Sequence, residues 1–297
     1  MFTGCRNENA CNACSEAEKT MTFSETIKAH KFELLAFVVL LGAVYHSIAH
    51  DMVLDWAKDD NYSHGFLVPF IAGYLAFMRK DDLLAAEVRP ADAGLGLVAL
   101  GLMLLFLGWL GTEYFTMRSS MVVILAGAVL YLLGWEIFTI LLAPLAYLLL
   151  MVPIPYIIYD AAAFPLKLFV TKVSVLSMKA LGVVVLQEGN ILMFPNITLE
   201  VADACSGLRS IMSLLALGAA YAFVFFPRAR DRVILILSTL PIAVFTNCLR
   251  VIATGILAQY FGSAAAEGFF HEFAGLFVFA GAVVMFVALG AVLKRWS

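Results

Sequence analysis

Long apolar stretches recur along this chain, and they constrain its fold more than any other feature of the sequence. The first runs from Phe32 to Ala49, and the stretches 94–110 and 119–134 are similarly long and poor in charge. A helix of about 20 such residues spans the hydrocarbon core of a bilayer. Hydrophobic residues make up 63% of the 297 residues and charged ones only 14%, more apolar surface than a soluble domain buries. We therefore expect an all-α, polytopic membrane protein.

The basic loops predict how the spans are oriented. Arg79, Lys80 and Arg89 mark one cytoplasmic loop, PRARDR at 227–232 marks another, and Lys294-Arg295 ends the last span. About eight transmembrane helices satisfy all of these loops, with both termini cytoplasmic in the plasma (inner) membrane. The expected spans are 32–49, 63–78, 94–110, 119–134, 137–152, 205–226, 233–258 and 271–293, the fourth and fifth forming a tight hairpin.

The N-terminal region differs from the rest of the chain. Residues 1–31 are polar and mixed in charge, which predicts a cytoplasmic, disordered tail before a transmembrane domain at 32–297. No cleavable signal peptide is evident. Cys5, Cys11 and Cys14 lie in this tail with a single CxxC pair, which favours reduced thiols over a zinc site because structural zinc normally takes four ligands.

One apolar stretch is not expected to cross the membrane. The segment 164–186 carries Lys167, Lys172 and Lys179 on roughly one helical face. If it spanned, the PRARDR loop would lie outside, against the positive-inside rule. We therefore predict an interfacial amphipathic helix on the outer face. The segment 187–203 alternates apolar and polar residues, which predicts a short extended segment beside it.

The sequence LEVADACSGLRS at 199–210 contains the cysteine best placed for chemistry. A helix beginning near residue 204 would put Cys205 in its first turn with Asp203 as N-cap, where the helix dipole favours a thiolate. Arg209 follows at i+4, and Ser206 precedes a glycine that lets a substrate backbone approach. A buried, inert cysteine is the alternative reading.

Two more polar groups fall at the same predicted depth. Asn247 and Arg250 lie in the span 233–258, with Arg250 about 25 Å from its cytoplasmic start. His271 opens the last span at the outer side. An arginine at membrane depth costs about 2.5–3.5 kcal/mol, so it is retained where it faces a polar cavity or a partner. The alternatives are a helix-pairing arginine and an interfacial histidine without a role.

These three groups suit acyl transfer from a peptide bond. Cys205 would attack the carbonyl carbon, His271 would act as general base and then acid, and Arg250 would stabilise the oxyanion. Arg209 would lower the thiol pKa or bind substrate, and spacing does not decide between the two arginines. His64, at the mouth of the second span, lines the site or sits at the membrane interface.

The order of these motifs resembles the exosortase/archaeosortase family of membrane transpeptidases. The resemblance is carried by ADACSGLRS, by Asn-xx-Arg in the next span, by a histidine opening the last span, and by SHGFLVPF at 63–70. It implies a Cys-Arg-His site facing the extracytoplasmic side, matching Cys205, Arg250 and His271. Asp203 replaces a glutamate common in relatives, and residues 1–31 have no counterpart.

The resemblance also implies the substrates and partners. These are tail-anchored secreted proteins whose C-terminus carries a short motif (Pro-Glu-Pro in bacteria), a transmembrane helix and a basic cluster, together with membrane lipid and an unidentified surface acceptor. No cofactor or metal is expected, and a net charge of −3 argues against nucleic acid. Two other classes stay open: a transporter, and a non-catalytic membrane subunit of a surface polysaccharide export system.

Overall fold

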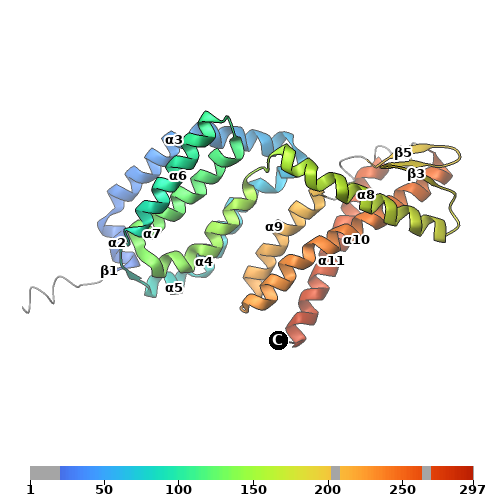
Figure 1. The fold of residues 1–297 in the computed structure, drawn as a ribbon. Helices are drawn as coiled ribbons and strands as arrows, with labels where there is room; N and C mark the ends of the chain where they lie inside the picture. The colour runs from blue at the N-terminus through green and yellow to red at the C-terminus, as the bar shows by residue number, and fades with distance from the viewer. Residues whose placement is uncertain (1–20, 202–207, 263–268, 297) are drawn as a thin grey trace, which may run out of the picture. The chain divides into compact units, whose positions relative to one another are not determined.

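The computed structural model describes residues 21–201, 208–262 and 269–296. These residues belong to two compact units, Met1–His50 with Ala72–Leu149, and Asp51–Ile71 with Leu150–Ser297. Most of the described residues are helical (Figure 1). The end of the predicted tail forms a strand, β1 (Met21–Thr22), and a helix, α2 (Phe23–Ala29).

The first unit is built around two packed helices. Its further elements are α3 (Lys31–Lys58, which continues into the second unit), the end of α4 (Val68–Met78), α5 (Lys80–Ala85), β2 (Glu87–Val88), α6 (Ala93–Leu110) and α7 (Tyr114–Tyr147). Strand β1 pairs antiparallel with β2.

Helices α6 and α7 pack closely because glycines line their contact. A Cβ atom built on Gly94 would lie 2.2 Å from the backbone nitrogen of Tyr131. Gly101 and Gly108 follow at seven-residue intervals and face α7 in the same way. Without a hydrophobic driving force between helices in lipid, such small residues let backbones approach for van der Waals contact.

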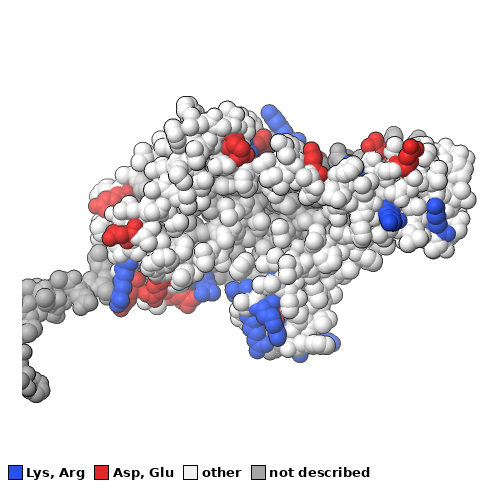
Figure 2. All heavy atoms as spheres, viewed as in Figure 1, with Lys and Arg blue, Asp and Glu red and all other residues white. Residues whose placement is uncertain are grey.

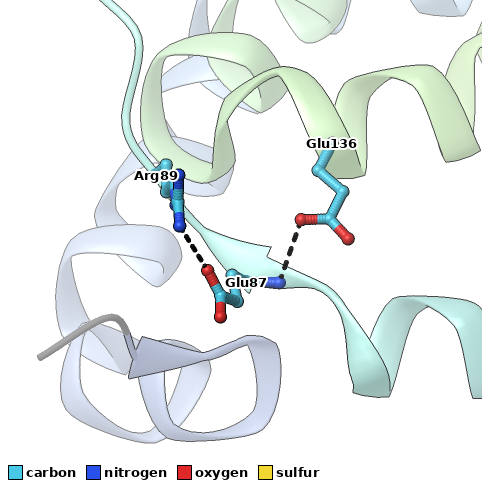
Figure 3. Close-up of polar contacts among 3 residues, drawn as sticks. All are labelled: Glu87, Arg89 and Glu136. Atoms are coloured by element: carbon cyan, nitrogen blue, oxygen red, sulfur yellow. Dashed lines mark hydrogen bonds and ion pairs between the residues drawn. The ribbon is translucent and has the colours of Figure 1, made fainter.

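Helix α7 is two helices joined at Gly134. This residue has φ +87° and ψ −177°, which are not helical values. Its main chain forms an isolated parallel β-bridge with that of Arg89. Close by, the backbone N–H of Glu87 donates to the Glu136 carboxylate at 3.3 Å, and Arg89 pairs with Glu87 at 2.8 Å (Figure 3). At 1.5 Å per residue an unbroken α7 would be about 51 Å long, well beyond the bilayer core. The break lies at the predicted connection between the fourth and fifth spans, and the hairpin itself stays a prediction.

A glycine is required at this break. A Cβ on Gly134 would lie 1.9 Å from the carbonyl oxygen of Arg89, and the dihedral angles alone cost a non-glycine residue about 1–3 kcal/mol. We expect Gly134→Ala to lower the melting temperature of the detergent-solubilised protein by several degrees. Gly96→Ala is the matched control, since no atom lies within 4 Å of its added Cβ. Equal melting temperatures for both variants would contradict this account.

The second unit contains every residue of the candidate site. Its elements are the 3₁₀ helix η1 (Asp60–Phe66), the end of η2 (Leu148–Met151), α8 (Tyr156–Ala180), β3 (Leu186–Glu188), β4 (Ile191–Met193), β5 (Thr198–Glu200), α9 (Leu208–Phe225), α10 (Ala229–Phe261) and α11 (Phe269–Trp296).

Helices α9, α10 and α11 form the body of this unit. Gly218 of α9 lies so close to both neighbours that an added Cβ would be 2.7 Å from Thr239 and 3.0 Å from Phe286. Gly290 of α11 packs in the same manner on Tyr221 of α9. The three helices are therefore held at short distances by small residues, as is common in membrane bundles.

The positive charges gather at one end of these helices. Lys294 lies over the rings of Phe225 and Phe226, which places the end of α11 beside the end of α9. Arg232 donates to the carbonyl oxygen of Phe226 at 2.6 Å. Figure 2 shows this end as a cluster of blue side chains. By the positive-inside rule we expect this end to face the cytoplasm.

Strands β3, β4 and β5 form an antiparallel sheet packed on α8 and α10. The predicted extended segment is therefore confirmed as β strands. Figure 1 shows α8 running across α10, and Figure 2 shows blue side chains over α8. Lys172 and Lys179 are exposed, while Lys167 is buried.

Six described helices are long and apolar enough to cross a membrane, which confirms a polytopic membrane protein. In this set α7 and η2 together form one candidate span, so the number of about eight spans stays a prediction. The set also includes α8, so the interfacial position of α8 stays a prediction as well. Part of α9, Ile211–Phe225, is a shorter apolar helix, and the predicted second span is η1 followed by α4.

Candidate functional site

Arg250 lies in the second half of α10, far from the basic end. Counted from Ala229 it is about 32 Å along the helix, somewhat further than the predicted 25 Å because α10 begins four residues earlier than expected. Its side chain is partly buried, and its Nε atom is shielded from solvent. Asn247, one turn earlier, is buried.

The guanidinium of Arg250 lies against the backbone of α11. A Cβ atom built on Gly275 would be 3.4 Å from Nη2 and 3.6 Å from Cζ of Arg250. A Cβ at these distances would be in ordinary van der Waals contact, whereas a longer side chain at 275 would compete with the guanidinium for this space. Gly275 therefore leaves room for a permanent cation beside the neighbouring helix.

His271 lies in α11 one helical turn before Gly275. Residues four apart lie on the same face of a helix, so the Cα of His271 is on the face that Arg250 contacts. The side chain of His271 is outside the described part. The structure thus brings together Arg250 and the helix turn that carries His271.

The predicted nucleophile lies outside the described residues, as do Asp203 and Ser206. The chain on both sides is described. Val201 is buried in the same core cluster as Val251, the residue after Arg250. Cys205 follows Val201 by four residues, so the chain between their Cα atoms spans at most about 14 Å. Arg209 is the second described residue of α9, and the predicted start near residue 204 lies outside the described residues.

His64 lies in η1, outside the six candidate spans. Its Nε2 atom donates to the carbonyl oxygen of Leu150 at 3.2 Å, which requires the proton on Nε2 and leaves the buried Nδ1 as an acceptor. Burial lowers the pKa of His64 below its ordinary value despite this hydrogen bond. Helix η1 packs against α9.

Several hydrogen bonds hold η1 in place, and no sequence pattern predicted them. Trp56 Nε1 donates to the carbonyl oxygen of Met151 at 2.9 Å, and Tyr62 donates to that of Ile154 at 3.1 Å. Gly65 lies against the Trp56 ring, where an added Cβ would be 2.4 Å from Nε1. This network fixes the position of His64 beside α9.

An apolar groove of about 550 Å³ lies between α8 and α10. Its α10 wall includes Cys248 and Ile252, which lie on the helix face opposite Arg250 because each is two residues away. The groove is therefore separate from the Arg250 face. Its lining residues are Phe169, Val173, Ser177, Leu240, Pro241, Val244, Phe245, Cys248, Leu249 and Ile252.

Within the described residues, no group of three or more His, Cys, Asp or Glu side chains is arranged to hold a metal ion. Arg250 can stabilise a negative charge, and a neutral histidine can exchange a proton near pH 7. The feature that sequence reasoning missed is Gly275, whose only signal was its i+4 spacing from His271.

The chain was compared with known proteins. A family model described as transmembrane exosortase (Exosortase_EpsH) matches residues 56–288, which is most of the chain. No curated protein and no solved structure matches. The matched range includes the whole of α8–α10, the strands between them and most of α11.

Proposed function

Because the chain belongs to the transmembrane exosortase family, we propose that it cleaves the C-terminal sorting tail of secreted proteins and transfers them to a cell-surface acceptor. Exosortases process sorting signals of the Pro-Glu-Pro type, and family membership implies a cysteine transpeptidase. The chain is a multi-pass membrane protein. Its substrates are therefore proteins that carry such a signal.

The proposed reaction begins at Cys205. Its thiolate attacks the carbonyl carbon of the scissile peptide bond, and the developing oxyanion is stabilised by the guanidinium of Arg250. His271 accepts the thiol proton and then donates it to the leaving amine, so the C–N bond breaks and a thioester forms. An acceptor nucleophile then attacks the thioester and releases the Cys205 thiol.

The contact between Arg250 and Gly275 carries this proposal. It holds a permanent cation one helical turn from the position of His271, at the end of the bundle opposite the basic loops. In a low-dielectric site a fixed cation stabilises an oxyanion without reorganisation. Arg209 is proposed to lower the thiol pKa or to bind substrate, with Asp203, Ser206, Asn247 and His64 in supporting positions.

Labelling from outside the cell tests the proposed activity and whether Cys205 faces the extracytoplasmic side of the membrane. A membrane-impermeant maleimide added to intact cells is expected to label Cys205 and to reduce tail cleavage in proportion. The Cys205→Ala variant should lose this label, since Cys248 is buried and the tail that carries Cys5, Cys11 and Cys14 is expected in the cytoplasm. A transporter with the same residues would keep its activity after labelling. Absence of external labelling, or labelling without loss of cleavage, would overturn the proposal.

The contact at Gly275 makes a separate prediction. We expect Gly275→Leu to displace the Arg250 guanidinium and to lower tail cleavage about 10- to 100-fold, because small misplacements of catalytic groups are costly. Gly281→Leu is the matched control on the same helix, since no atom lies within 4 Å of its added Cβ. Cleavage is measured on a tail-bearing protein by the mass of its new C-terminus. Equal rates for the two variants would contradict this role of Gly275.

A further inference from the structure

In the described part of the chain, the small sheet of the second unit has an unpaired edge strand, and the segment with the proposed nucleophile follows this strand in sequence. Strand β5 pairs with β4 alone in the described part of the chain. It ends at Glu200, five residues before Cys205, a distance of at most about 18 Å along the chain. A peptide that pairs with β5 would therefore lie within about 18 Å of the thiol when it binds at the end of the strand.

The register of the sheet shows which main-chain groups face this edge. The N–H of Val201 donates to Asn190 and that of Phe194 to Ile197. In an antiparallel ladder the bonded residues alternate, so Leu199 also faces β4. The N–H and C=O groups of Thr198 and Glu200 consequently point away from β4, and both residues are exposed.

The position of β5 is fixed on its other sides. Leu192 and Val201 are buried in the core cluster that contains Val251, next to Arg250. The side chain of Asn190 donates to the Glu200 carboxylate at 3.1 Å and to the carbonyl oxygen of Val201 at 3.3 Å. These contacts hold the end of the strand, and within the described residues nothing pairs with its outer main-chain groups.

We propose that the outer edge of β5 binds the sorting motif of the substrate as an added strand, through the main-chain N–H and C=O groups of Thr198 and Glu200. The inference rests on the proposed function. Strand addition gives affinity through main-chain hydrogen bonds and orients a peptide along the edge. It would deliver an extended tail segment toward Cys205.

A Pro-Glu-Pro segment suits this edge. Successive residues of a strand direct their N–H groups to opposite sides, and proline has no N–H to donate. With prolines at alternate positions, all of the missing donors fall on the side away from β5. The glutamate between them directs its own N–H and C=O toward Thr198 or Glu200.

The test measures cleavage of a synthetic tail peptide by the purified, full-length protein in nanodiscs. Glu200→Pro removes one outward N–H and is expected to raise KM about two- to tenfold, the usual effect of one lost hydrogen bond. Gln187→Pro is the matched control. Strand β3 is the opposite edge of the sheet, and by the same register the N–H of Gln187 faces away from β4. This variant should keep the KM of the parent.

A modified peptide tests the same bond without altering the protein. N-methylation of the motif glutamate is expected to raise KM about two- to tenfold. N-methylation three residues later, where the N–H faces away from β5, should leave KM unchanged. Equal KM values for Glu200→Pro and Gln187→Pro, or for the two methylated peptides, would overturn the strand proposal. Cleavage by Cys205→Ala would instead overturn the proposed function, so the two failures are distinguishable.

Discussion

Replacing Cys205 with alanine is expected to abolish processing of a co-expressed secreted protein that carries a C-terminal sorting tail. In the proposed mechanism no other group can form the thioester, and loss of a nucleophile costs about 10⁴–10⁶-fold in rate in comparable enzymes. The mass of the processed C-terminus, measured in cells that express parent or variant, provides the readout.

A second cysteine supplies the control for this experiment. Cys248 is buried and faces the apolar groove on the opposite side of α10 from Arg250. We expect Cys248→Ala to process the tail at nearly the parent rate. Processing that persists in Cys205→Ala at the level of Cys248→Ala would remove the catalytic role of Cys205.

Replacing Arg250 with alanine is expected to lower cleavage about 10²–10³-fold, the loss seen when one oxyanion donor is removed from a preorganised site. The effect should fall on kcat more than on KM, because the oxyanion exists only in the transition state. Arg250→Lys should retain part of the rate, since lysine keeps the charge but not the planar guanidinium that rests on Gly275.

Arg295 is the control for this prediction. It lies in the last turn of α11, at the opposite end of the bundle, and it is exposed. Arg295→Ala should therefore cleave the tail at nearly the parent rate once expression is matched. A parent-like rate for Arg250→Ala in correctly inserted protein would show that this arginine serves helix packing only.

Much of the helical architecture could be predicted from the apolar stretches. The predicted span 94–110 differs from α6 by one residue at its start, and the predicted connection between the fourth and fifth spans coincides with the break at Gly134 in α7. The extended segment near 187–203 forms β3–β5. Hydrophobic periodicity and charge suffice to predict such features because helices and strands depend mainly on neighbouring residues in the sequence.

Features that depend on tertiary contacts could not be predicted in this way. The Arg250 guanidinium occupies space that is free because Gly275, on another helix, has no side chain. The position of η1 depends on backbone carbonyls of residues 150–154, which any sequence carries. Likewise, the open edge of β5 follows from pairing register and not from the residue types in the strand.

The membrane depth predicted for Arg250 agrees with the described part of the candidate site. From the sequence we expected Arg250 and the start of the last span to lie at the same depth in the membrane. In the structure Arg250 contacts α11 one turn after His271. The roles of Cys205, Arg250 and His271 remain predictions. The hydrophobic spacing could not reveal that α10 extends about 50 Å, beyond a bilayer core.

The most direct test is to find the covalent intermediate. Purified protein in nanodiscs is incubated with a tail peptide and no acceptor, quenched in acid and analysed by peptide mass spectrometry. The account predicts a hydroxylamine-sensitive thioester on Cys205 that carries the N-terminal fragment of the peptide, and its much slower formation in the Arg250→Ala and His271→Ala variants. An acyl group on a different residue, or cleaved peptide formed by Cys205→Ala, would contradict it.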